Sequence, residues 1–182
     1  MRSAKRPLPP LDSPSIERLA LRYVERFATT RAKLATYLNG KIRQRGFDGT
    51  PPDTTIIAER FASAGYIDDR AFGEARARAM ARRGLGARRV SGALRHAGIN
   101  EDDSAAIAPA IADRAAEAAV TFARKRRIGP FADQLADRPT REKHVAAMIR
   151  AGHDFGLARR IATMAPGEDV TVLLEDGYPM RG

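Results

Sequence analysis

The sequence predicts an all-α fold, an elongated and curved tandem array of three three-helix repeats of the helix-turn-helix type. Three observations support this fold. Apolar residues recur at i, i+3 and i+4 along most of the chain, and almost no segment alternates with the period of two residues typical of strands. The sequence Asp-Arg-Ala also opens two segments, at residues 69 and 113. Helices with thin apolar stripes bury little area alone, so consecutive units are expected to stack and share a core.

The first repeat contains three expected helices. The first lies in SIERLALRYVERFATT (residues 15–30), after a Ser-Pro-Ser sequence that can supply an N-cap. The second lies in RAKLATYLNGKIRQRG (residues 31–46) and ends at its glycine. The third lies in DTTIIAERFASAG (residues 53–65), started by Asp53 or Thr54.

The second and third repeats restart with DRAFGEARARAMARRG and DRAAEAAVTFARKRRIG. Their expected core positions follow the first repeat: Leu34, Tyr37 and Leu38 correspond to Val90, Ala93 and Leu94 and to Val145, Met148 and Ile149, while Ile57 and Phe61 correspond to Ile107 and Ile111 and to Leu157 and Ile161. Pro109 is expected to kink or shorten its helix. The sequence therefore predicts nine short helices.

These patterns predict five segments along the chain. They are a disordered, basic, proline-rich tail over residues 1–14, repeats over 15–67, 68–112 and 113–165, and an acidic C-terminal tail over 166–182. Within the last segment, DVTVLLED is expected to be a short strand or part of the tail.

Composition limits the classes of function. The 182 residues carry a formal net charge of +10, which favours an acidic partner, with nucleic acid the first candidate and a membrane surface the alternative. No apolar run approaches the roughly eighteen residues that span a bilayer, and no segment resembles a signal peptide, so we expect a cytoplasmic protein without a membrane partner. The chain has no cysteine, which excludes disulfides, a thiolate nucleophile and cysteine-ligated zinc.

Catalytic motifs are not found. There is no P-loop, GLGARR lacks the strand and the third glycine of a dinucleotide fingerprint, and no serine lies in a nucleophile elbow. His144, His153 and Asp154 lack the spacing of a metal site. The pairs Asp68-Asp69 and Asp102-Asp103 lie where helices begin, and capping explains them. We therefore expect no enzyme activity, no cofactor and no metal.

The arginines and lysines of the second and third repeats are the candidate binding residues. Arg88 and Arg95 are seven residues apart and project away from the Val90 side of their helix, and Lys143 and Arg150 repeat this relation. The candidate set is Arg76, Arg82, Arg83, Arg88, Arg89, Arg95, Arg124, Lys125, Arg126, Arg127, Lys143 and Arg150. Solvation of helix faces and interaction with helix dipoles are the structural alternatives for these cations.

The expected mode of nucleic-acid binding is charge-driven and dependent on salt. Only 6% of residues are aromatic and none is tryptophan, so a stacking platform for single strands is poorly supported. GARRVSGALRHAG lacks the bidentate asparagine or glutamine set of a recognition helix. We expect contacts with the phosphates of single- and double-stranded DNA and no reading of base sequence.

The segment AGYIDDRAFGEARARAMARRGLGARRVSGALRHAGI resembles the central segment of the RecX family of recombination regulators. The motif positions are Tyr66, Asp68, Asp69, Phe72, Arg76, Arg83, Gly84, Arg88 and Arg89. The resemblance implies an all-helical modulator that lies in the groove of the RecA nucleoprotein filament, contacts both protein and DNA, and suppresses ATP hydrolysis and strand exchange. We expect this chain to be a monomer. The first and third repeats and both tails lie outside the motif.

Two other interpretations remain open from the sequence. A plain nucleic-acid-binding protein without a protein target would bind the filament no better than naked single strands. A protein-only adaptor would bind tightly regardless of salt and nuclease. We also expect the acidic tail to fold back on the basic surface and weaken binding, which truncation after Pro166 would test.

Overall fold

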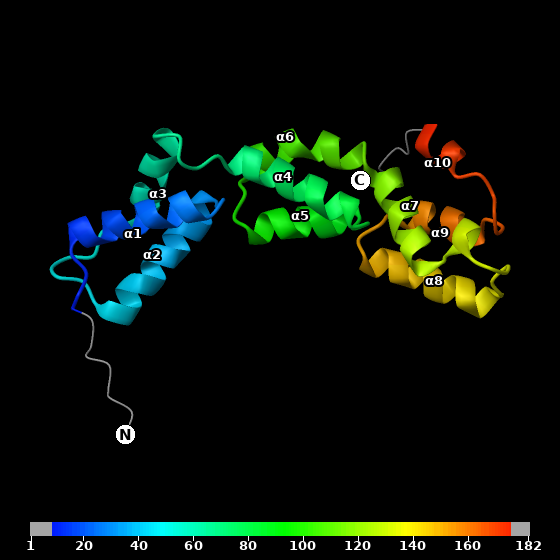
Figure 1. Ribbon diagram of the computed structural model, residues 1–182, viewed down its shortest axis with the longest axis horizontal. Helices are drawn as coiled ribbons and strands as arrows, with labels where there is room; N and C mark the ends of the chain where they lie inside the picture. The colour runs from blue at the N-terminus through cyan, green and yellow to red at the C-terminus, as the bar shows by residue number, and fades with distance from the viewer. Residues whose placement is uncertain (1–8, 176–182) are drawn as a thin grey trace, which may run out of the picture. The chain divides into compact units, whose positions relative to one another are not determined.

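The computed structural model describes the backbone of residues 9–175 and the side chains of residues 9–174, and this part of the chain is helical (Figure 1). The helices are α1 (Ser13–Arg26), α2 (Arg31–Arg45), α3 (Thr54–Ser63), α4 (Asp69–Arg82), α5 (Ala87–His96), α6 (Glu101–Ala112), α7 (Ala115–Arg126), the 3₁₀ turn η1 (Gly129–Phe131), α8 (Arg138–Arg150), α9 (Phe155–Thr163) and α10 (Thr171–Glu175). The all-α prediction is confirmed. Helix α1 begins at Ser13, within the expected N-terminal tail. No strand and no membrane-crossing helix occurs among the described residues.

The chain forms two compact units. The first comprises the described residues up to Phe72 together with Ala97–Ile99, and the second comprises Gly73–His96 and the described residues from Asn100 onward. The predicted boundaries of the repeats stay a prediction.

Local sequence signals explain how the helices of the first unit begin and end. Asp12 caps α1, since its carboxylate accepts a hydrogen bond from the Ser15 amide at 2.9 Å. The cap therefore precedes the Ser-Pro-Ser sequence that was expected to supply it. Gly46 ends α2 at φ 77°, a conformation that favours glycine. Asp53 caps α3, as predicted.

The core of the first unit lies between α1, α2 and α3. Its buried members are Leu11, Ile16, Ala20, Leu34, Leu38, Ile57, Ala58, Phe61 and Ile67. Tyr23 and Tyr37 stack at its edge with ring centroids 4.3 Å apart. The periodic positions predicted for α2 and α3 therefore supply the core. Phe27, which continued the apolar pattern of α1, is 51% exposed because α1 ends at Arg26.

Leu11 differs from the expected disordered tail. Its side chain is fully buried, its amide donates to the Gly46 carbonyl at 3.0 Å, and its carbonyl accepts from Asp48 at 2.7 Å. The long loop after α2 holds this segment, because it supplies both backbone partners and Phe47 packs on the same core. Residues 1–8 of the expected tail lie outside the described residues.

An ion pair closes the first unit around the start of α4. Asp69 is buried, and its carboxylate accepts from the Arg31 amide and from Arg31 Nε, both at 3.0 Å. Thr30 Oγ1 donates to the carbonyl of Ala97 at 2.6 Å. Asp68 caps the following turn through the Ala71 amide, as predicted, whereas Asp69 has this separate role.

We expect Asp69→Asn to destabilise the first unit by about 2 kcal/mol, because the Arg31 guanidinium loses its buried anionic partner and keeps the exposed Glu59, at 3.3 Å. This loss of stability is smaller than the loss expected for a fully buried ion pair, because the Arg31 side chain is 30% exposed. Urea unfolding followed by circular dichroism measures the change. Asp68→Asn is the matched control, because an asparagine retains the cap; equal losses in both variants would contradict the role assigned to the ion pair.

The core of the second unit lies between α7, η1, α8, α9 and α10. Its buried members are Ala119, Val120, Ala123, Ile128, Met148, Leu157, Ala158, Ile161, Ala162, Met164 and Leu173. Ile149, predicted to be a core position of α8, is 37% exposed. Pro109 lies within α6, which continues to Ala112.

The segment DVTVLLED forms a short helix, α10, and no strand. Leu173 of α10 is 2% exposed and belongs to the core of the second unit. Glu168 accepts a hydrogen bond from the Ala165 amide, and Asp169 accepts from Thr171, so these two carboxylates have local partners. Residues 176–182 lie outside the description, and the expected docking of the tail stays a prediction.

Candidate functional site

All twelve candidate cations are exposed, and all belong to the second unit. Arg76, Arg82 and Arg83 lie on or just after α4, Arg88, Arg89 and Arg95 on α5, Arg124, Lys125, Arg126 and Arg127 at the end of α7, and Lys143 and Arg150 on α8. On α5 the opposite side is buried, with Val90 and Leu94 at 2% and 1% exposure. The face predicted for Arg88 and Arg95 is therefore the solvent face of α5.

The loop between α4 and α5 is seated on the loop between α8 and α9. The Gly86 amide donates to the Ala151 carbonyl at 2.9 Å, and the Arg88 amide donates to the Gly152 carbonyl at 3.1 Å. Since Ala151 and Gly152 follow Arg150 directly, these bonds bring the end of α8 beside the start of α5. We call this contact between residues 84–88 and 150–153 the loop junction.

Glycine makes the loop junction possible at two positions. A Cβ on Gly86 would overlap the backbone of Gly152 and His153. A Cβ on Gly152, whose φ is +94°, would lie 2.5 Å from the Arg89 amide nitrogen. The two backbones therefore approach more closely than any side chain permits.

The end of α7 completes the loop junction. Lys125 Nζ donates to the Arg83 carbonyl at 3.2 Å, and a Cβ on Gly84 would lie 2.9 Å from the Phe122 amide nitrogen. Cations of α4, α5, α7 and α8, separated by up to about seventy residues in sequence, are thus held around one set of contacts. We call Arg82, Arg83, Arg88, Arg89, Arg124, Lys125, Arg126, Arg127 and Arg150 the cationic cluster.

The four consecutive cations at the end of α7 also have neighbours within the unit. Arg124 lies 5.0 Å from the centroid of the Phe131 ring and Arg126 lies 5.7 Å from that of Phe122. Arg127 forms an exposed ion pair with Asp133 at 3.5 Å. Exposed contacts of this kind contribute little stability, so the positive charges remain accessible to a polyanion.

Three of the candidates lie outside the cationic cluster. Arg76 is on α4 about two turns before the loop, Arg95 is near the other end of α5, and Lys143 is about two turns before Arg150 on α8. Seven residues of helix separate Arg88 from Arg95 by about 10 Å. Among the described side chains, none of these three forms an ion pair.

His153 holds the loop junction together from within. The ring is 2% exposed, its Nε2 lies 3.1 Å from the Gly84 carbonyl oxygen, and it packs on Phe122 with centroids 5.4 Å apart. Because a carbonyl only accepts, Nε2 carries the hydrogen and the neutral ring leaves Nδ1 without a partner among the described atoms. Burial lowers the pKa of His153, and the hydrogen bond to Gly84 opposes this shift only in part.

The lowered pKa predicts a loss of stability in mild acid. The unfolded chain binds the proton more readily than the folded chain, so this contribution is present above pH 6.5 and is lost as the pH falls below it. We expect the melting temperature of the wild type to fall from pH 7.5 to pH 5.5 by more than that of His153→Gln, whose amide can donate to Gly84 without titrating. Thermal unfolding at the two pH values measures the difference. Equal falls in the two proteins would contradict a buried neutral His153.

Sequence reasoning did not find the Arg31 and Asp69 pair or the role of His153. Asp69 was assigned to capping because it precedes a helix, and no pattern along the chain connects it with Arg31. His153 was considered only as a metal ligand with His144 and Asp154. Among the described residues, no group of three side chains is arranged to hold a metal, and Asp154 caps α9 through the Leu157 amide at 3.1 Å.

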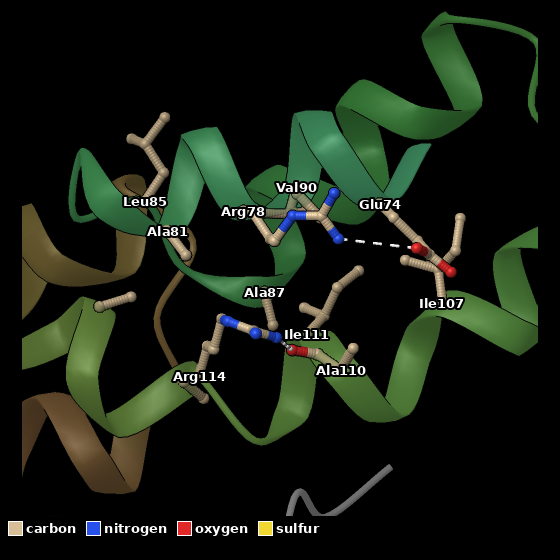
Figure 2. Close-up of a pocket in the computed structure, with 13 residues that line it drawn as sticks. Glu74, Arg78, Ala81, Leu85, Ala87, Val90, Ile107, Ala110, Ile111 and Arg114 are labelled. Atoms are coloured by element: carbon tan, nitrogen blue, oxygen red, sulfur yellow. Dashed lines mark hydrogen bonds and ion pairs between the residues drawn. The ribbon is translucent and has the colours of Figure 1, made fainter. Parts of the chain in front are cut away.

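A pocket of about 180 Å³ lies between α4, α5, α6 and the start of α7 (Figure 2). Its wall is mainly aliphatic, with Leu85, Val90 and Ile107 among the lining side chains. Two arginines border it: Arg78 pairs with Glu74 at 3.6 Å, and Arg114 donates to the Ala110 carbonyl at 2.9 Å (Figure 2). This lining provides apolar packing and contains no nucleophile beside a general base.

Known proteins with similar sequences are regulatory proteins. The chain is 30% identical over 156 residues to a protein of Mycobacterium sp. (strain JLS) named "Regulatory protein RecX", covering 85% of this chain and 76% of that protein. It is 29% identical over 163 residues to the protein of the same name from Myxococcus xanthus (strain DK1622), covering 83% and 86% of the two chains. No protein-family model matches the chain.

Two solved structures have the same fold. The crystal structure of RecX from Lactobacillus salivarius superposes with a TM-score of 0.63 at 19% identity, covering 80% of this chain and 91% of that one. A second crystal structure, of regulatory protein RecX, gives a TM-score of 0.61 at 22% identity, covering 81% and 72%.

Proposed function

Because the chain belongs to the RecX family of regulatory proteins, we propose that it regulates homologous recombination by binding the RecA–DNA filament and inhibiting its ATPase and strand-exchange activities. In this role it acts without catalysis of its own. It works in the cytoplasm as a monomer. Its partners are the RecA filament and the phosphates of single- and double-stranded DNA.

The observation that carries this proposal is the cationic cluster. Nine exposed cations lie at the ends of four helices. Backbone hydrogen bonds join the α4–α5 loop to the α8–α9 loop, and Lys125 Nζ joins the end of α7 to the Arg83 carbonyl. A filament of recombinase on DNA presents phosphates repeatedly along its length, and a fixed group of cations complements such a partner better than a mobile basic tail does. Arg76, Arg95 and Lys143 extend the proposed surface along α4, α5 and α8.

The decisive experiment is a titration of DNA-dependent ATP hydrolysis. The RecA recombinase of the same organism is assembled on single-stranded DNA at physiological salt, and this protein is added at increasing ratios to RecA. We expect inhibition well below one molecule per RecA subunit, because a regulator of filament growth or stability affects many subunits at once.

Other outcomes would favour the other two functions. Inhibition only when the protein saturates the DNA, with a steep dependence on salt and no preference for the filament over naked strands, would indicate a plain nucleic-acid-binding protein. Binding to RecA that survives nuclease and high salt would indicate a protein-only adaptor. Either result would replace the proposed function.

A further inference from the structure

An apolar groove in the second unit is separate from the cationic cluster. It lies between α8 and α9 of the second unit and has a volume of about 570 Å³. Its apolar lining consists of Val145, Ala146 and Ile149 from α8 and Phe155 from α9. Neither Lys143 nor Arg150 lines it, so a ligand can occupy the groove independently of the proposed DNA surface.

The side chains of this groove are more exposed than packing of the unit requires. Ile149 is 37% exposed and Phe155 is 56% exposed, whereas Met148 of α8 and Leu157 and Ile161 of α9 are buried. Single exposed apolar residues are common on proteins, but here two lie in one hollow that Val145 and Ala146 continue. The groove therefore retains apolar area that a partner would bury.

Positive charge surrounds the apolar floor. Arg138, Arg141 and Arg159 line the groove, and the only acidic lining residue, Glu142, is paired with Arg138 through an Nε to Oε1 distance of 3.0 Å. The groove thus has an excess of two positive charges beside its apolar floor. An occupant that is both apolar and acidic complements both features.

The length of the groove indicates the form of this occupant. The lining residues of α8 run from Arg138 to Ile149, which corresponds to about 16 Å of helix. This is the length of about three turns of a second helix, whose apolar residues at i, i+4 and i+7 would face the floor. The aliphatic floor offers no hydrogen bonds to base edges and only one aromatic ring, Phe155, for stacking, which disfavours nucleic acid.

We propose that the groove between α8 and α9 is a docking site for a short acidic amphipathic helix of a protein partner. Its apolar residues occupy the floor beside Phe155 and Ile149, and its carboxylates face Arg141 and Arg159. The site rests on the groove itself and does not depend on the proposed regulation of RecA. A variant that loses DNA binding through Arg88 and Arg95 is expected to retain it.

The test uses a labelled synthetic peptide and the full chain. The probe is a fluorescein-labelled 14-residue peptide with leucines at i, i+4 and i+7 and glutamates elsewhere on its surface, and anisotropy reports binding. Two control peptides replace the leucines by serine or the glutamates by lysine. We expect the leucine and glutamate peptide to bind at least tenfold more tightly than either control, because binding needs both apolar contact and negative charge.

Matched variants locate the binding. Phe155→Ala should weaken binding of the probe about tenfold, as expected for loss of one buried aromatic side chain. Arg159→Glu should weaken binding of the probe and reduce the dependence of this binding on salt concentration. The controls are Leu135→Ala, an exposed apolar residue outside the groove, and Arg43→Glu, an exposed cation of α2; both should stay within twofold of the wild type. Circular dichroism should show unchanged helicity in all four.

Four outcomes would overturn the proposal. The first is that the serine control peptide binds as tightly as the probe, which would indicate binding by charge alone. The second is that the Phe155→Ala and Arg159→Glu variants bind the probe as tightly as the wild type does. The third is an equally large loss of single-stranded oligonucleotide binding in Phe155→Ala, which would assign the groove to nucleic acid. The fourth is a wild-type dimer in light scattering that Phe155→Ala converts to a monomer, which would assign it to a second copy of this chain.

Discussion

Gly86→Ala should destabilise the protein by about 3 kcal/mol, the upper part of the usual range for a single substitution, and lower its melting temperature by about 10 °C. The added Cβ would overlap the backbone of Gly152 and His153, and neither neighbour is a flexible side chain that can move aside. The bond from the Gly86 amide to the Ala151 carbonyl would break with the displacement. Thermal unfolding followed at 222 nm measures the effect.

Gly92→Ala is the matched control in the neighbouring helix. Gly92 lies inside α5, and the nearest atom to its added Cβ is an Arg95 nitrogen at 4.0 Å. Because alanine favours the helix, this variant should be about 0.5–1 kcal/mol more stable than the wild type. Similar melting temperatures in the two variants would show that the loop junction does not require close contact of the two backbones.

Gly86→Ala should also weaken DNA binding although it removes no charge. The loop junction holds the start of α5 against the end of α8, so displacing Gly86 separates cations that a phosphate backbone contacts together. Measurement at a temperature well below the melting point of the variant separates this effect from unfolding. Unchanged DNA affinity there would mean that the cations act independently of their arrangement.

Arg88→Glu combined with Arg95→Glu should abolish binding to the RecA–DNA filament while leaving helicity intact. Both side chains are on the solvent face of α5, opposite Val90 and Leu94, so the substitutions leave the core unchanged. Each reversal removes an attraction to phosphate and adds a repulsion, and we expect affinity to fall about 100-fold or more at physiological salt. Co-sedimentation with the filament and anisotropy with labelled DNA measure the two partners separately.

The control for this pair is Arg22→Glu combined with Arg43→Glu, on exposed positions of α1 and α2. It changes the net charge by the same amount but lies in the first unit. If net charge alone determined filament binding, both pairs of substitutions would weaken that binding equally. Retained filament binding by the Arg88 and Arg95 variant would exclude the α5 face as the site.

Much of the fold can be predicted from the sequence because helices carry local signals. Apolar spacing identified Leu34, Leu38, Ile57 and Phe61 as core residues, and all four are buried. The same spacing was wrong at Ile149, because the face of α8 that contains it borders the groove instead of the core. Periodicity shows that a residue has an apolar face but not whether a neighbouring helix covers it.

The candidate site shows the same division. Exposure of Arg88 and Arg95 follows from their place opposite Val90 on one helix. The grouping of Arg83, Lys125 and Arg150 does not follow from any local pattern. These residues are more than twenty positions apart in sequence and are brought together only by the loop junction. Gly84 is only a motif position in the sequence, whereas its role in the fold depends on how near the Phe122 backbone lies.

By itself, the sequence determined the helical class, the excess of positive charge and the resemblance to the RecX family, because propensity, composition and short motifs are properties of neighbouring residues. Only the tertiary structure decided which distant groups meet. It paired Asp69 with Arg31, buried His153 against Gly84 and left the groove beside Phe155 open. These contacts depend on the packing of helices far apart in the chain, and no local pattern encodes that packing.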